Sequence, residues 1–215
     1  MTGFEPFGGR SANPSELVAR KLEGRRIAGR PVVICVLPVE TEGLRARLEA
    51  AIAQEEPELL LGTGLAAGRT AVSLERVAVN TLDFSVPDNA GELRQNKVID
   101  RSGPHARLSP MPFAEIVEQW QQHGVPGYLS NSAGTHLCNQ MLYESLGIAE
   151  TISPPLTAGF IHLPNLPEQA VADGAETTAS MSLDLMEKAV ELAIATTIPW
   201  IERRNAGRQA AAVGA

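Results

Sequence analysis

Residues 31–61, PVVICVLPVETEGLRARLEAAIAQEEPELLL, decide the fold because they read as a strand, a helix and a second strand in succession. The first nine residues form a nearly continuous apolar run, which is typical of a strand buried on both faces. Apolar side chains then recur at helical spacing over residues 43–56, and residues 58–61 form a second apolar run. This order predicts parallel strands joined by a crossover helix.

The same alternation continues to the C-terminal end. Strands are predicted at residues 71–80, around Tyr128 and around Phe160, and helices at residues 112–123, from Cys138 onward and at 182–204. The apolar alternation slips by one residue at Glu75 and Arg76, which predicts a bulge or bend. We expect Pro199 to bend or shorten the last helix. The whole pattern predicts an α/β fold of three α/β/α layers with a mostly parallel, twisted central sheet.

Composition favours one domain and excludes several classes of partner. The chain has 215 residues, 44% of them hydrophobic, and a net charge of −7. We expect a single α/β domain over residues 1–207 and a frayed, Ala/Gly-rich tail at 208–215. The acidic balance argues against nucleic acid, and no apolar run is long enough to span a membrane. The start of the chain lacks the pattern of an export signal.

The chain contains two cysteines, Cys35 and Cys138. They form neither a disulfide framework nor a zinc spacing, so we expect no metal and no cofactor. Free thiols suit a reducing, cytoplasmic setting.

Cys138 and His162 lie where an α/β protein would place catalytic groups. Thr135 is a plausible N-cap, which puts Cys138 in the first turn of a helix, where the dipole favours the reactive thiolate. His162 ends a short apolar strand that Pro164 stops. Each residue alone is more often an ordinary part of a core. Together they outline a nucleophile and its base.

Glu75 completes this outline as a third group. It is a carboxylate within a run of β-branched residues that reads as a strand. It either pairs with Arg76 or another surface charge, or it orients His162 and stabilises the cationic imidazole, as the acid of a catalytic triad does.

One glycine motif is misleading. Residues 62–67, GTGLAA, match the dinucleotide-binding pattern G-x-G-x-x-A. That pattern requires a helix to begin at the loop, and the segment that follows reads as a strand. We therefore reject an oxidoreductase, and we expect Gly64 to let the backbone turn closely beside a ligand pocket.

Several short motifs are spread between Thr2 and about Ile201. They are TGFEPFGG at 2–9 with NPS at 13–15, GR at 68–69, ERVAVN at 75–80, PDNAG at 87–91, SAGTHLCN at 132–139 and GFIHLP at 159–164. Together they resemble the pyroglutamyl peptidase I family, the pyrrolidone-carboxylate peptidases, which are cysteine peptidases. The separations between Glu75, Cys138 and His162 also fit that family.

The resemblance implies a catalytic domain that removes N-terminal pyroglutamyl residues from peptides. It implies that Cys138 is the nucleophile, His162 the base and then acid, and Glu75 the group that orients His162. We expect the substrate to meet a set of pocket residues: Phe4, Phe7, Asn13, Gly64, Asp88, His136 and Leu137. Phe4 and Phe7 would form apolar walls, Asn13 would hold the adjacent loop, and Asp88 either acts near the site or stabilises its own loop.

The chain departs from the family pattern in three ways. Only Met1 precedes the first motif, so a first strand is missing or its start lies upstream. His136 occupies a position that is usually apolar and aromatic. Ser85 and Leu65 stand where some relatives carry a basic residue and a glutamine, so contacts to the oxyanion and lactam would be weaker or rerouted.

Two other functions remain open. The chain could be a cysteine hydrolase of another small cyclic amide, or a non-catalytic relative that binds peptides. The resemblance also implies a homo-oligomer, often a homotetramer.

Overall fold

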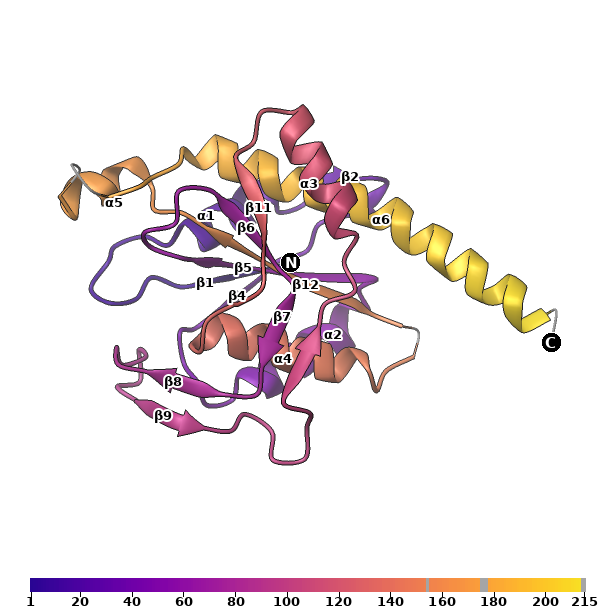
Figure 1. Ribbon diagram of the computed structural model, residues 1–215, viewed down its shortest axis with the longest axis horizontal. Coiled ribbons are helices and arrows are strands. Elements are labelled where there is room, and N and C mark those ends of the chain that lie inside the picture. The colour runs from indigo at the N-terminus through magenta and orange to yellow at the C-terminus, as the bar shows by residue number, and fades with distance from the viewer. Residues whose placement is uncertain (154, 175–177, 214–215) are drawn as a thin grey trace.

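A six-stranded sheet forms the centre of the computed structural model, which describes residues 1–153, 155–174 and 178–213 (Figure 1). The strands follow the order β11-β6-β12-β5-β1-β4. Their bounds are β1 Thr2–Phe4, β4 Cys35–Leu37, β5 Leu59–Leu65, β6 Val72–Glu75, β11 Gly127–Ser130 and β12 Thr157–Leu163. Strands β4, β1, β5 and β12 are parallel, whereas β6 and β11 run the opposite way. The predicted mostly parallel sheet is confirmed.

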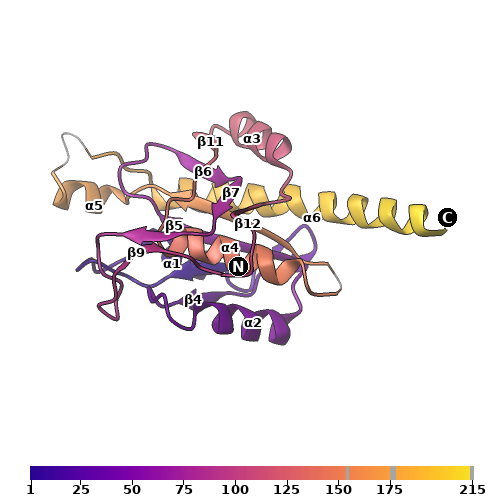
Figure 2. The ribbon, with the colours of Figure 1, turned by 60° about the horizontal axis from the view of Figure 1, so that its bottom comes forward.

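Helices cover both faces of this sheet. On one face lie α1 (Pro14–Leu22), α3 (Phe113–Gln122) and α6 (Leu183–Val213); on the other lie α2 (Leu44–Glu55) and α4 (Leu137–Ala149). Figure 2 shows α3 and α6 toward its top and α2 toward its bottom. Because successive side chains of a strand point to opposite faces, Phe160 packs in the α2/α4 cluster while Ile161 packs in the α1/α3/α6 cluster. The predicted three layers are therefore present.

The apolar run at residues 31–39 is not one strand, which corrects the prediction. Only Cys35–Leu37 joins the sheet, as β4, while β3 (Arg30–Pro31) forms a small hairpin with β2 (Arg26–Ile27). Pro31 and Pro38 have no N–H to donate, and Val33 is 43% exposed. The run therefore pairs in two short pieces.

The predicted bend at Glu75 and Arg76 is confirmed. Strand β6 ends at Glu75, and the chain leaves the central sheet before β7 (Val77–Val79), which pairs with β10 (Ala106–Leu108). A further hairpin joins β8 (Leu82–Phe84) to β9 (Arg94–Lys97). Glu75 is thus the last residue of a central strand.

Helix α6 is longer than the sequence pattern predicts. It continues past Pro199 to Val213 and projects beyond the other elements in Figure 1. Its inner face packs on the core through residues such as Val190, Ile198 and Ile201, which holds the helix across the proline. Residues 208–213, expected to be frayed, continue it; the three alanines there have high helix propensity. Residues 214–215 lie outside the described part of the chain. A short helix, α5 (Pro167–Ala172), precedes α6.

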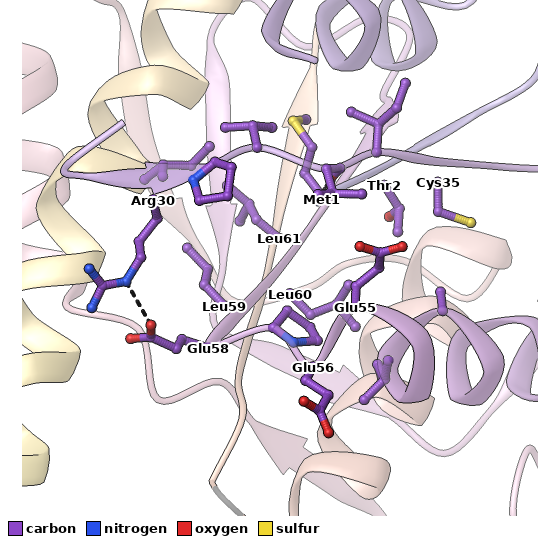
Figure 3. Close-up of a pocket in the computed structure, with 18 of the residues that line it drawn as sticks. Met1, Thr2, Arg30, Cys35, Glu55, Glu56, Glu58, Leu59, Leu60 and Leu61 are labelled. Atoms are coloured by element: carbon purple, nitrogen blue, oxygen red, sulfur yellow. Dashed lines mark hydrogen bonds and ion pairs between the residues drawn. The ribbon is translucent and has the colours of Figure 1, made fainter. Parts of the chain in front are cut away.

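A cavity of about 510 Å³ lies in line with β1, between residues 30–35 and 57–61 (Figure 3). The first strand is present, because Thr2 pairs with Cys35 on one side and with Gly62 on the other. Residues 59–61 of β5 pair with β12 only, so their other edge faces this cavity. The Met1 ammonium donates to the Val33 carbonyl at 2.5 Å, and burial lowers the pKa of this amino group to about 6. The cavity therefore has the position and walls of an extension of β1.

We predict that four apolar, β-branched residues added ahead of Met1 will stabilise the fold. They would pair with both walls and replace a desolvated ammonium by a neutral amide. We expect the melting temperature to rise by about 2–8 °C, measured by calorimetry. A Gly-Ser extension of equal length is the control, since it removes the ammonium without adding apolar side chains. Equal melting temperatures for the two extensions would show that the cavity accepts no strand.

Candidate active site

A second cavity, of about 340 Å³, lies where β1, β5, β12 and the start of α4 meet. Seven of the predicted site residues line it: Phe4, Phe7, Asn13, His136, Leu137, Cys138 and His162. They come from distant parts of the chain, so the fold assembles them. Glu75, Gly64 and Asp88 do not line the cavity.

Cys138 is the second residue of α4, and so lies in the first turn of a helix, as the sequence predicted. The N-cap is His136 rather than Thr135, and no side chain caps the helix. The Thr135 hydroxyl instead donates to the Asp83 carbonyl at 2.6 Å, which corrects the predicted cap. The first N–H groups of an uncapped helix have no partner within the helix, so they remain free for other acceptors.

Gly64 brings Cys138 and His162 together. Gly64 and His162 are direct partners in the parallel β5–β12 ladder. A Cβ at Gly64 would lie 2.6 Å from Cys138 Sγ and 2.8 Å from the Phe160 ring. The missing side chain therefore leaves the space that the thiol occupies. Gly64 lies within a strand and makes no turn, which corrects the expected reason for the glycine.

Glu75 and His162 form a buried hydrogen-bonded pair. His162 Nδ1 donates to Glu75 Oε1 at 2.8 Å, and both side chains are almost completely buried. Antiparallel pairing of β6 with β12 sets this geometry, since His162 lies opposite Ser73, two residues before Glu75. The structure thus brings the three predicted catalytic residues to one place, and Glu75 pairs with neither Arg76 nor solvent.

Arg69 is a further residue of this site, which the sequence reasoning did not single out. Its Nη1 donates to Glu75 Oε1 at 2.5 Å and to the Ser73 hydroxyl, and its Nη2 donates to the Ser132 carbonyl at 3.1 Å. It also lines the cavity. One guanidinium therefore ties the acid to the loop that leads into α4. Its place in the GR motif, shortly before Glu75, was the available signal.

At neutral pH, the ionised groups of this cluster are Glu75 and Arg69. Burial by itself would raise the pKa of Glu75, but the hydrogen bond from His162 and the Arg69 charge outweigh it, so the pKa falls below its usual range. Burial lowers the pKa of His162, and Glu75 offsets this only in part. At neutral pH, Glu75 is therefore ionised and His162 is a neutral imidazole, the form that can accept a proton.

Cys138 is a protonated thiol in this structure, which corrects the expectation of a thiolate. Burial and the nearby Glu75 charge raise the pKa of the thiol to about 12, against a smaller lowering by Arg69. The helix N-terminus does not outweigh this desolvation. The thiol therefore needs a base, and the neutral His162 lines the same cavity.

Aromatic rings form one wall of the cavity. The His136 ring lies 4.1 Å from the Phe84 ring and 6.2 Å from the Phe7 ring, measured between centroids. Leu65 and Val86 add apolar surface. The cavity thus has a mainly apolar lining, to which Phe4 and Phe7 both contribute.

Asp88 and Asn13 have structural partners. Asp88 Oδ1 accepts from the backbone N–H groups of Ala90 and Glu92, and Oδ2 accepts from the Thr41 N–H and hydroxyl. The structure therefore places Asp88 in the loop-stabilising role. Asn13 caps α1 through Ser15 and donates to the Glu5 carbonyl, so it holds residues 4–5 and not the loop at 7–9.

Ser85 is exposed and does not line the cavity. Among the described residues, no group of three or more His, Cys, Asp or Glu is arranged to hold a metal. No helix in that part of the chain combines the length and hydropathy needed to cross a membrane.

Known proteins resemble this chain over nearly its whole length. A family described as pyroglutamyl peptidase matches residues 1–199. A pyrrolidone-carboxylate peptidase of Pyrococcus furiosus is 39% identical over 196 residues, which cover 90% of this chain and 94% of that protein. A solved mutant pyrrolidone carboxyl peptidase from the same organism superposes with a TM-score of 0.90 at 38% identity, covering 93% of this chain and 97% of the other.

A more distant structure gives the same result. The pyroglutamyl peptidase I of Bacillus amyloliquefaciens superposes with a TM-score of 0.87 at 33% identity, covering 92% of this chain and 93% of the other. Because the sequence and structural matches all extend over nearly the whole chain, this protein belongs to the pyroglutamyl peptidase family.

Proposed function

We propose that this protein is a cysteine peptidase that removes an N-terminal pyroglutamyl residue from peptides. The observation that carries the proposal is the assembly of Cys138, His162 and Glu75 beside an apolar cavity of about 340 Å³. A pyroglutamyl ring is small and uncharged, so it suits such a cavity. A protein that only bound peptides would not need a nucleophile, a base and a buried acid together.

The reaction follows from the protonation states of the three residues. His162 takes the thiol proton as Cys138 Sγ attacks the carbonyl carbon of the scissile amide. The tetrahedral intermediate collapses when the C–N bond breaks and His162 gives the proton to the leaving amine. Water, activated by His162, then hydrolyses the acyl-thioester and frees pyroglutamate and the thiol. Glu75 stabilises the imidazolium that forms twice in this cycle.

The start of α4 supplies the oxyanion site in this proposal. The uncapped N–H groups beside Cys138 lie at the positive end of the helix dipole. They are fixed before the reaction begins, which makes them effective for a developing negative charge. Backbone N–H groups can stabilise the oxyanion without a basic side chain. Turnover is therefore compatible with an exposed serine at position 85, where some relatives carry a basic residue.

Two further predictions concern the oligomeric state and the cellular location of the protein. A homotetramer is expected from the family resemblance, and apolar side chains such as Val33, Leu108 and Tyr128 are exposed and available for contacts. A cytoplasmic location fits two free cysteines, Cys35 and Cys138, one of which must stay reduced to act.

We predict that Cys138→Ser will lower kcat on a fluorogenic pyroglutamyl amide by on the order of a thousandfold or more, since a serine hydroxyl is a much weaker nucleophile. Cys35→Ser is the matched control and should stay active, because Cys35 lines the other cavity. Circular dichroism checks that both variants fold. A Cys138→Ser enzyme with the wild-type rate would disprove the mechanism.

We predict that Glu75→Gln will reduce kcat by about a thousandfold or more while KM changes by only a few-fold, because Glu75 acts through His162. Glu75 raises the pKa of His162, so its loss should also move the acid limb of the pH–rate profile to lower pH.

Glu144→Gln is the control for a lost buried carboxyl. Burial raises the pKa of Glu144 to about 7, and the residue lies outside the cavity, so glutamine should leave kcat unchanged. An effect of Glu75→Gln on KM alone would place Glu75 in substrate binding.

We predict a preference of about a thousandfold or more in kcat/KM for pyroglutamyl over prolyl and glutaminyl amides. Both competitors would bring an ammonium into an apolar cavity without a carboxylate partner. The three matched fluorogenic amides, together with other cyclic amides, measure this preference. Equal cleavage of the prolyl amide, or none of the pyroglutamyl amide, would overturn the assignment.

A further inference from the structure

One oxygen of the Glu75 carboxylate has no hydrogen-bond partner among the described residues. Glu75 Oε1 accepts from His162, Arg69 and Ser73, whereas Oε2 is buried and accepts from none of them. Glu75 is completely buried, and its lowered pKa keeps it ionised at neutral pH. An ionised oxygen is costly to bury without a donor, because it loses its water and gains nothing in return. A donor is therefore needed on the side of Oε2.

The central sheet places the Ser130 side chain beside Glu75. Strand β6 lies between β12, which carries His162, and β11, which carries Ser130 (Figure 1). Ser130 is the direct partner of Glu75 in the parallel β11–β6 ladder, and it is itself buried. Directly paired residues of neighbouring strands project from the same face of a sheet. Glu75 therefore has an imidazole toward one neighbouring strand and a hydroxyl toward the other.

The Ser130 hydroxyl can leave its present partner at little cost. It donates to the Ser132 carbonyl at 3.2 Å, whereas O–H donors usually lie at about 2.7–2.8 Å from their acceptors. The same carbonyl also accepts from the Arg69 guanidinium, so it keeps a charged donor when the hydroxyl turns away. A hydroxyl has only one proton to give, and a carboxylate is a stronger acceptor than a peptide carbonyl.

We propose that Ser130 is a positioning residue that donates its hydroxyl to Glu75 Oε2 and thereby limits the pull of Glu75 on the proton of His162. The inference rests on the proposed function and adds a group that acts through the acid. The dipole of the hydroxyl offsets part of the Glu75 charge, so less of that charge is left to hold a proton on the imidazole. Ser130 then helps to keep His162 neutral, which is the form that can take the thiol proton.

The other titratable and charged side chains near Glu75 come from three elements. They are His162 on β12, Arg69 on the β5–β6 connection and Cys138 on α4. Because Ser130 is uncharged, replacing it leaves all three of them in place. A change in the proton affinity of His162 then reports on the Glu75 charge.

The first test compares Ser130→Thr with Ser130→Val. The two side chains have the same shape and suit a strand, but only threonine carries a hydroxyl, and the valine methyl leaves no space for a water. The pKa of His162 is measured by NMR titration of enzyme with isotope-labelled histidine, and His162→Gln assigns the signal. We expect this pKa to be higher in the valine variant by about half a pH unit or more.

The direction of the change separates this role from a merely structural one. Glu75 raises the pKa of His162, so a variant that only loosened their contact would lower that pKa. Equal values in Ser130→Thr and Ser130→Val, or a lower value in the valine variant, overturn the proposal. Ser130→Ala covers the case in which valine does not fold, and its His162 pKa should lie above that of the wild type.

Two controls test whether the effect passes from Ser130 through Glu75. In a Glu75→Gln background, Ser130→Ala should leave the pKa of His162 unchanged, because the charge that the hydroxyl offsets is gone. Ser132→Ala removes a neighbouring hydroxyl whose oxygen accepts from the exposed Gly134 N–H. It should also leave that pKa unchanged. A rise in Ser132→Ala but none in Ser130→Ala would assign the donor to Ser132 and overturn the proposal.

The pH–rate profile gives a second readout. His162 must be neutral to act as base, so Ser130→Ala should move the acid limb of kcat/KM to higher pH, opposite to the shift expected for Glu75→Gln. At the pH where the wild type is half-maximal, the variant should lose about twofold or more, and KM should change by less than about twofold. An acid limb that stays in place overturns the proposal. Failure of the wild type to cleave a pyroglutamyl amide would instead be the failure of the proposed function, and the NMR titration would still decide the role of Ser130.

Discussion

The close packing of α4 against β5 is the constraint on which the site depends. Side chains at Gly62 and Gly64 would run into Met141, Phe160 and Cys138. Because these positions have no Cβ, α4 lies directly on the sheet. Its second residue, Cys138, projects over Gly64, which is the strand partner of His162. The packing of α4 on the sheet, which also forms part of the core, therefore fixes the relative positions of the nucleophile and its base.

A charged cluster then joins the pieces that this packing brings near. Glu75 ends β6, His162 lies on β12, and Arg69 reaches from the β5–β6 connection to Ser132 ahead of α4. A lone buried carboxylate would be strongly unfavourable, so the hydrogen bonds that Glu75 Oε1 accepts from His162, Arg69 and Ser73 are required for Glu75 to stay ionised there. The cluster both fixes the imidazole and keeps it neutral until a proton arrives from the thiol.

Prediction from the sequence was most successful where the signal was local. The helix beginning near Cys138, the strand around His162 and the break after Glu75 all follow from short patterns of apolar, β-branched and Pro/Gly residues. The interruption of residues 31–39 and the length of α6 were missed. The interruption of residues 31–39 depends on which strands pair, and the length of α6 depends on its packing against the core. A local sequence pattern contains neither kind of information.

The sequence by itself determined the α/β class, the order of its elements and the three residues able to act as nucleophile, base and acid, because hydrophobic periodicity and side-chain chemistry are properties of short segments. Only the tertiary structure decided that the pKa of the Cys138 thiol is raised, that Asp88 holds its own loop, and that Arg69 shares Glu75 with His162. Proton affinities and hydrogen-bond partners depend on burial and on atoms far away in the chain, and these exist only once the layers have packed.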